Sequence, residues 1–228
     1  MKKLVIIPAY NEKDTIISTV KEIEKEAPDY DYIIINDCST DNTLDLIRYN
    51  GYDVLNLPVN LGIGGAVQTG YFYAYSHHYD IAVQIDADGQ HDVSYLSAME
   101  KHLLENNCDM VIGSRFIDKK GFQSSGLRRI GINFFHHLLF LLFRVRITDP
   151  TSGFRMCNQR TIAMFANEYP RDYPEPESTA RLLRHKRKVE EEAVIMRKRR
   201  GGVSSISMMR SVYYMFKVTL AIIIERFR

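Results

Sequence analysis

Short apolar runs alternate with helical patterns along the first half of the chain. Five of these runs are apolar almost throughout, as strands covered on both faces are: residues 4–7, 32–35, 53–57, 81–85 and 110–112. Between them, apolar residues recur at the three- and four-residue spacing of amphipathic helices, at 16–23, 44–47 and 66–75. The alternation predicts an α/β fold: a mostly parallel sheet with helices on both faces.

The second half has a less regular pattern. A polar loop at 114–129 precedes an apolar helix that is expected to end near Arg146. A charged helix at 177–188 and a strand at 193–196 are expected after it. We divide the chain into a domain at 1–205 and a C-terminal amphipathic helix at 206–228.

The C-terminal helix has an unusually wide apolar face. On a helical wheel one narrow stripe holds Arg210, Tyr214, Lys217, Ala221, Glu225 and Arg228, and nearly everything else is apolar. Such an arc is typical of a helix that lies at a bilayer surface or against the helices of a partner. A core helix or a homodimer seam remains the alternative interpretation.

Charge is divided unevenly along the chain. Residues 1–100 contain 16 acidic and 6 basic side chains, and residues 101–228 contain 12 acidic and 24 basic ones. An acidic half suits a bound cation, and a basic half suits anions such as phosphates or an anionic membrane surface. The three single cysteines are typical of reduced thiols in a cytosolic protein.

The run from Ile85 to His91 places two carboxylates, Asp86 and Asp88, one residue apart after an apolar strand. Both carboxylates then reach the same small volume at the end of that strand. This arrangement suits a hard divalent ion, Mg2+ or Mn2+, that keeps sites for the oxygens of a diphosphate. An acidic turn that caps the next helix is the alternative.

Several motifs follow one another in a specific order: Pro8-Ala9-Tyr10-Asn11-Glu12, Asn36-Asp37-x-Ser39-x-Asp41, Asn60-x-Gly62-x-Gly64, Asp86-x-Asp88-Gly89-Gln90, Gly113-Ser114-Arg115-Phe116, Thr151-Ser152-Gly153-Phe154-Arg155 and Arg199-Arg200-Gly201-Gly202. Together they resemble the family 2 inverting glycosyltransferases. Within that family the series is most similar to the dolichyl- or polyprenyl-phosphate sugar synthases. The resemblance covers residues 3 to 206 and implies the Rossmann-like GT-A fold.

The resemblance also implies roles for individual residues. Nucleotide-sugar contacts are implied for Pro8, Ala9, Tyr10, Glu12, Asp37, Asn60, Gly62, Gly65, Asp86 and Ala87. Metal binding is implied for Asp86, Asp88 and Gln90. Catalytic contributions are implied for Asp88, Arg115, Arg128, Arg129, Arg199 and Arg200.

Among these arginines, Arg115 is expected to hold phosphate oxygens, a task suited to a planar and permanently charged fork. One arginine of the pair 128–129 and one of the pair 199–200 are expected around the acceptor phosphate. The motif does not distinguish the members of each pair.

A phosphate acceptor would explain why no general base is evident. An ionised phosphate attacks the sugar directly, so that positioning and charge neutralisation suffice. A hydroxyl acceptor needs a base, for which Glu175 or Glu177 is a candidate.

We therefore predict a metal-dependent inverting glycosyltransferase for cell-envelope glycan synthesis. It would move a sugar from a UDP- or GDP-linked donor to a polyprenyl phosphate at the cytoplasmic face of the membrane, where the protein is expected to be peripherally attached. A small membrane protein or a second copy is a possible partner, and nucleic acid is not expected. A hydroxyl acceptor on a growing polysaccharide is the first alternative, and a non-enzymatic membrane-surface protein is a more distant one. The sugar and the oligomeric state remain undetermined by the sequence.

Overall fold

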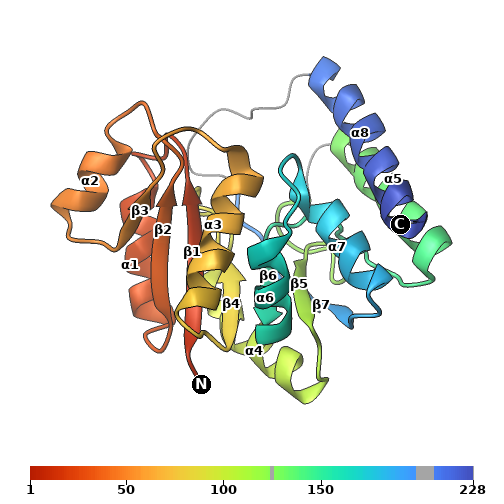
Figure 1. The fold of residues 1–228 in the computed structure, drawn as a ribbon, viewed down its shortest axis with the longest axis horizontal. Helices are drawn as coiled ribbons and strands as arrows, with labels where there is room; N and C mark the ends of the chain where they lie inside the picture. The colour runs from red at the N-terminus through yellow and green to blue at the C-terminus, as the bar shows by residue number, and fades with distance from the viewer. Residues whose placement is uncertain (124–125, 199–207, 228) are drawn as a thin grey trace.

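A computed structural model describes residues 1–123, 126–198 and 208–227. Its centre is a seven-stranded sheet with the strand order β3-β2-β1-β4-β6-β5-β7 (Figure 1). The strands are β1 (Lys3–Ala9), β2 (Asp31–Asn36), β3 (Val54–Asn56), β4 (Ile81–Gln84), β5 (Met110–Ser114), β6 (Arg155–Asn158) and β7 (Val189–Ala193). The predicted mixed α/β fold is confirmed.

Helices cover both faces of this sheet (Figure 1). They are α1 (Ile16–Glu26), α2 (Thr43–Tyr49), α3 (Gly62–Ser76), the short 3-10 helix η1 (Val93–Tyr95), α4 (Leu96–Glu105), α5 (Gly126–Phe143), α6 (Gln159–Asn167), α7 (Pro174–Arg184) and α8 (Met208–Phe227). One face packs against α1, α2 and α4, and the other against α3, α5, α6, α7 and α8.

The alternation of side chains along β1 shows how both faces are filled. Val5 and Ile7 are buried against α1, whereas Leu4 and Ile6 are buried against α3. Because both faces of the strand are covered by helices, successive residues along it are apolar.

The second half of the sheet differs from its prediction. Strand β6 was not anticipated, and it runs antiparallel to both β4 and β5. The strand expected at 193–196 is wrong in position, because β7 ends at Ala193. Likewise the charged helix begins three residues earlier than expected, at Pro174, and α5 ends at Phe143 rather than near Arg146. Arg155, at the start of β6, is fully buried, a placement that hydropathy does not predict.

The C-terminal helix packs on the rest of the molecule. Val218 and Ile222 of α8 are buried in the same apolar cluster as Phe135 and Leu139 of α5. Figure 1 shows α5 and α8 side by side, next to α7. Across the described ranges, no helix combines the length and the hydropathy that a membrane crossing requires.

Candidate active site

The carboxyl ends of β1, β2 and β4 lie next to one another because these strands are parallel neighbours. The loops after β1 and β2 are tied together by Asn11. Its backbone N–H donates to Ser39 Oγ (3.0 Å), and its Oδ1 accepts from the backbone N–H of Thr40 (2.8 Å). The neighbouring Tyr10 is exposed and Glu12 is buried, so that Tyr10 faces the open edge of the sheet. The motifs that follow Pro8 and Asn36 are therefore brought together, as predicted for such a sheet.

Asp37, the predicted contact to the nucleotide base, is also part of the loop structure. Its Oδ1 accepts a hydrogen bond from the backbone N–H of Leu61 (2.7 Å), while Asn60 donates to the Asp37 carbonyl (3.1 Å). Burial raises the pKa of Asp37, and the N–H groups of Leu61 and Gly62 partly offset that rise. Asp37 thus holds the start of α3 beside the open edge of the sheet.

The three glycines at the start of α3 are required for different physical reasons. Gly62 has φ +76°, a backbone conformation that glycine adopts without strain in a tight turn. A Cβ on Gly64 would lie 2.2 Å from the carbonyl oxygens of Pro170 and Arg171, and one on Gly65 would lie 2.4 Å from Leu61 Cβ. Close packing therefore explains Gly64 and Gly65 without a ligand.

The loop after β4 presents Asp86 more openly than Asp88. The Asp86 side chain is 34% exposed, and its Oδ1 accepts from Gln84 Nε2 (2.9 Å). The Asp88 residue is buried, and its Oδ1 accepts from the backbone N–H of Gln90 (3.0 Å). The two carboxylates therefore belong to one loop, with Asp86 at its accessible end.

For His91 the sequence allows either metal binding or loop packing, with loop packing favoured, and the structure places it against this loop. Its Nδ1 accepts from the backbone N–H of Asp86 (3.1 Å), and its ring stacks on Phe154 with centroids 4.9 Å apart. An imidazole that accepts at Nδ1 carries its proton on Nε2 when neutral. His91 thus orients the Asp86 loop by packing, as the alternative to metal binding would require.

The space beside Asp86 suits a cation. A Cβ on Gly153 would lie 3.1 Å from Asp86 Oδ2 and 3.0 Å from Gln84 Nε2, so that a side chain at Gly153 would crowd this carboxylate. Carboxylate oxygens are the ligands that Mg2+ and Mn2+ prefer. The residues present therefore fit a divalent ion. Gln90 has another partner, since its Nε2 donates to the carbonyl of Arg197 (3.4 Å).

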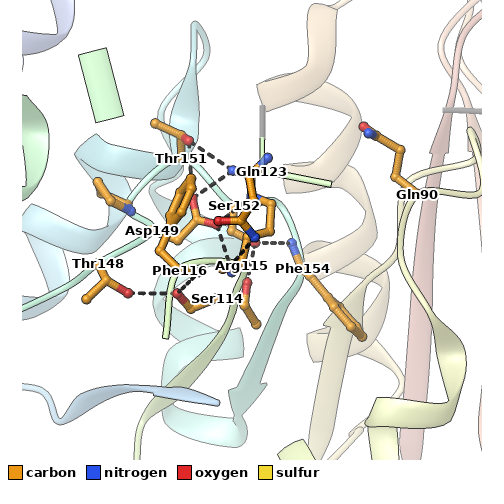
Figure 2. Close-up of polar contacts among 12 residues, drawn as sticks. Gln90, Ser114, Arg115, Phe116, Gln123, Thr148, Asp149, Thr151, Ser152 and Phe154 are labelled. Carbon is orange, nitrogen blue, oxygen red and sulfur yellow. Dashed lines mark hydrogen bonds and ion pairs between the residues drawn. The ribbon is translucent and has the colours of Figure 1, made fainter. Parts of the chain in front are cut away.

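The phosphate role of Arg115 stays a prediction, and the structure gives this side chain a second, structural role. Arg115 is buried, and its Nε and Nη2 donate to the two oxygens of Asp149 (2.6 and 2.7 Å). Figure 2 shows this cluster, with Thr148, Thr151 and Ser152 around it and Gln90 on a separate loop. An arginine that makes a bidentate contact with a buried carboxylate is a structural link between two loops.

That link determines where the Gly153 loop lies. Ser152 Oγ donates to the Gly113 carbonyl (2.7 Å), and the backbone N–H groups of Thr148 and Asp149 donate to Glu191 (both 2.7 Å). The two motifs that contain Arg115 and Gly153 are thereby joined. Their joint effect is to hold Gly153 next to Asp86.

A second buried arginine lies beneath the site. The guanidinium of Arg155 donates to the carbonyls of Ser152 (2.7 Å) and Pro150 (2.9 Å), and to the hydroxyls of Ser178 (2.9 Å) and Thr179 (3.1 Å). It thereby connects the Gly153 loop to the second turn of α7. Only the position of Arg155 in a motif indicated a role for it in the sequence.

Glu175 and Glu177, the two candidate bases, are separated by the structure. Burial raises the pKa of Glu175, the positive charges of Arg155 and Arg128 oppose that rise, and Asp86 adds to it. Glu177 lies instead 3.4 Å from Arg181, on the side of α8. Only Glu175 of this pair is therefore within electrostatic reach of the Asp86 loop.

The predicted acceptor arginines are partly described. Arg128 and Arg129 are exposed in the first turn of α5. Arg128 lowers the pKa of Glu175, and Arg129 lies 5.9 Å from the ring centroid of Phe116. The geometry therefore favours Arg128 as the member of the pair that borders the site. Arg199 and Arg200 lie outside the described residues.

Known proteins resemble this chain in sequence and in fold. The UDP-N-acetylglucosamine–dolichyl-phosphate N-acetylglucosaminyltransferase of Methanococcus voltae is 29% identical over 205 residues, which cover 81% of this chain and 80% of that protein. An uncharacterised protein of Methanocaldococcus jannaschii is 34% identical over 66% of this chain, and the match spans 62% of that relative. The undecaprenyl-phosphate mannosyltransferase of Micrococcus luteus is 28% identical over 71% of this chain and 68% of its own length.

The fold has solved counterparts. Glucosyl-3-phosphoglycerate synthase from Mycobacterium tuberculosis, crystallised with Mn2+, UDP and phosphoglyceric acid, superposes with a TM-score of 0.72 at 19% identity, covering 99% of this chain and 78% of that one. At this identity the likeness concerns the fold. The sequence model of glycosyl transferase family 2 matches residues 4–164, which include the Asp86 loop and β6. The chain is therefore a glycosyltransferase and belongs to glycosyl transferase family 2.

Proposed function

We propose that this chain transfers one sugar from a UDP-linked donor to a polyprenyl phosphate, with inversion at the sugar C1. The observation that carries the proposal is the pair of opposite charges around Glu175, which lies within electrostatic reach of both Asp86 and Arg128. We infer from this that the accessible carboxylate and the arginine belong to one site. A donor diphosphate with its cation suits the Asp86 side, and an acceptor phosphate suits the Arg128 side.

The relatives support the acceptor and the donor. The Methanococcus voltae protein is named for a UDP-sugar and a dolichyl phosphate, and the Micrococcus luteus protein for undecaprenyl phosphate. UDP is also bound in the glucosyl-3-phosphoglycerate synthase structure. We assign the uridine donor to this chain on that basis, with Asp37 and the 60–62 loop as the contacts to the nucleoside.

The reaction needs few groups from the protein. Asp86 and Asp88 would hold a divalent cation, which neutralises charge on the departing diphosphate when it is bound. An oxygen of the acceptor phosphate attacks C1, the bond from C1 to the UDP oxygen breaks, and UDP leaves with the electron pair. Because that attacking oxygen is already ionised, the chain has to orient the two anions and exclude water. Arg128 orients the acceptor, and Arg155 keeps the Gly153 loop beside Asp86.

A mass-spectrometric assay tests this proposal. The protein is incubated in detergent with undecaprenyl phosphate, Mn2+ or Mg2+, and UDP-glucose, UDP-N-acetylglucosamine or GDP-mannose in turn. The expected result is a lipid-linked sugar phosphate and an equal amount of UDP. A protein that binds UDP but yields no lipid product with any of these donors would contradict the acceptor assignment.

A hydroxyl acceptor is the second candidate, and the raised pKa of the partly buried Glu175 favours it. A carboxyl group with a raised pKa is suited to accept the proton of an attacking hydroxyl. Glu175→Gln separates the two candidates. Transfer to a hydroxyl is expected to fall by about 10²–10⁴-fold in this variant, whereas transfer to a phosphate, which needs no base, is expected to change by less than about tenfold.

A further inference from the structure

The polar stripe of α8 contacts the rest of the protein at Tyr214, Lys217 and Glu225. Glu225 is 3% exposed, and its carboxylate is paired with Arg181 Nε (2.8 Å) and Arg184 Nε (3.0 Å) of α7. On the same side, Lys217 is paired with Asp172, and the ring of Tyr214 packs edge-on against that of Tyr173 with centroids 4.4 Å apart. Buried charge pairs of this kind specify which side of a helix turns inward.

With the polar stripe turned inward, the apolar side of α8 is exposed. Its side chains are between 48% and 80% exposed, and they are Tyr213, Phe216, Leu220, Ile224 and Phe227. They recur at three- and four-residue spacing and so form one continuous ridge along the helix. A row of exposed aromatic and aliphatic side chains of this length marks an interaction surface.

Helix α5 extends this surface. A Cβ on Gly131 would lie 3.1 Å from Met215 Sδ, so the absence of a side chain there lets α5 approach α8 closely. Arg226 Nε also donates to the Leu142 carbonyl (3.0 Å). Ile130, Phe134 and Leu141 of α5 are exposed as well, between 42% and 67%. We call these three residues and the α8 ridge together the apolar face.

Apart from the Lys217–Asp172 pair, the exposed charges along α5 and α8 have one sign. Between residues 126 and 146 the chain has no acidic residue, and α8 has only Glu225, which is buried and paired. Exposed arginines border the face instead, and they are Arg128, Arg129, Arg144 and Arg226. An apolar surface with a cationic border is complementary to a bilayer that contains anionic phospholipids.

We propose that the apolar face docks on the surface of an anionic phospholipid bilayer, with α5 and α8 lying in the plane of the interface. A second copy of the chain fits this face less well, because a two-fold contact would bring the bordering arginines of both copies together. Docking also places Arg128, in the first turn of α5, at the level of lipid phosphates. The inference extends the proposed function, in which the acceptor phosphate arrives from that surface.

Vesicle flotation tests the docking without any acceptor. Wild-type protein is mixed with phosphatidylcholine vesicles, with or without phosphatidylglycerol, and no polyprenyl phosphate is present. Binding is expected to the anionic vesicles, to weaken as salt is raised, and to fall at least tenfold in the double variant Phe216→Glu/Leu220→Glu. Phe72→Glu, at a 60% exposed position on α3, is the matched control and is expected to bind as the wild type does.

Two further measurements keep the result interpretable. Phe227→Glu, at the 80% exposed end of α8, repeats the test where unfolding is least expected, and thermal unfolding checks each variant. Light scattering in solution reports the oligomeric state. A wild type that stays off anionic vesicles, an equal loss in Phe72→Glu, or a dimer that the ridge variants dissociate would each overturn the proposal.

Transfer to a short, water-soluble isoprenyl phosphate separates docking from the proposed function. Ridge variants are expected to retain this transfer while they lose vesicle binding. Vesicle binding by a protein without transferase activity would refute the proposed acceptor and leave the docking intact. Transfer without vesicle binding would refute the docking and leave the proposed acceptor intact.

Discussion

The two halves of the molecule hold their functional side chains in different ways. In the first half, Asp37 and Asn11 are held by backbone N–H groups of nearby loops. In the second half, buried ion pairs between distant segments take over, as in Arg115–Asp149 and Arg181–Glu225. A backbone N–H is supplied by almost any residue, whereas a buried ion pair needs one particular side chain of opposite charge. The second half therefore depends more than the first on the identity of individual distant side chains.

The largest effect is expected where a buried pair of the second half is broken. Asp149→Asn leaves the guanidinium of Arg115 buried without its anion, which is expected to cost about 3–5 kcal/mol of unfolding free energy. Urea unfolding measures the loss. Asp118→Asn, in an exposed pair with Lys120, is the control and is expected to change stability by less than about 1 kcal/mol. Unchanged stability together with weaker UDP binding in Asp149→Asn would indicate that Arg115 binds phosphate rather than stabilising the fold.

The next effect concerns the first half and is expected in activity rather than in stability. Asp86→Asn removes one charge from the accessible carboxylate of the cation site, so that sugar transfer is expected to fall by about 10²–10³-fold. Steady-state rates with and without a chelator measure this loss, and wild-type activity is expected to fall similarly when metal is removed. Asp45→Asn, at an exposed position on α2, is the control. Full activity of the wild type in chelator would count against a cation at Asp86.

A smaller effect is expected where the two halves meet. Gly153→Ala places a Cβ 3.1 Å from Asp86 Oδ2, so the carboxylate has to shift by a few tenths of an ångström. We expect about a tenfold loss of turnover, or about 1.4 kcal/mol in the barrier. Gly126→Ala, where a Cβ meets nothing within 4 Å, is the control. Equal rates in both variants would show that the space beside Asp86 is not used.

The smallest effect is a pH dependence far from the site. His102 of α4 lies between Glu192 (2.6 Å) and Glu190 (2.7 Å) of β7. Burial lowers the pKa of His102, but the hydrogen bonds to Glu192 and Glu190 outweigh burial and raise it above 6.5.

Because the pKa of His102 is higher in the folded chain, the stabilisation is complete below about pH 6.5 and is lost as the pH rises through the folded value. Unfolding free energies measured across that range are expected to fall for the wild type, and to fall less for His102→Gln. Parallel pH profiles of the two proteins would show that this pair of contacts is not linked to proton binding.

Much of the first half was predictable because its strands and tight turns are encoded in short runs of residues. Strands such as 4–7 and 32–35 were found to within a few residues, and the Asp86-x-Asp88 loop lies at the end of β4 as expected. The Gly62 turn was likewise visible in sequence, because only a residue free of a Cβ adopts φ +76° without strain. The exception is Gly64, whose packing partners Pro170 and Arg171 lie more than a hundred residues away.

The second half resisted prediction where partners are distant. Strand β6 is short, contains the buried Arg155 and pairs antiparallel with β4, so neither hydropathy nor strand alternation revealed it. The structural role of Arg115 was not foreseen, because its partner, Asp149, comes from a loop 34 positions later. The amphipathic pattern of α8 was visible, but its orientation was not.

By itself, the sequence determined the α/β class, the positions of the first four strands along the chain and the loops that follow them. Periodicity and turn chemistry are encoded within a few residues. Only the tertiary structure decided which arginines are structural and which side of α8 faces outward. Those outcomes depend on long-range partners: Asp149 for Arg115, and Arg181 with Arg184 for Glu225. The partner of a buried charge is the opposite charge that the fold brings within contact distance, wherever that residue lies along the chain.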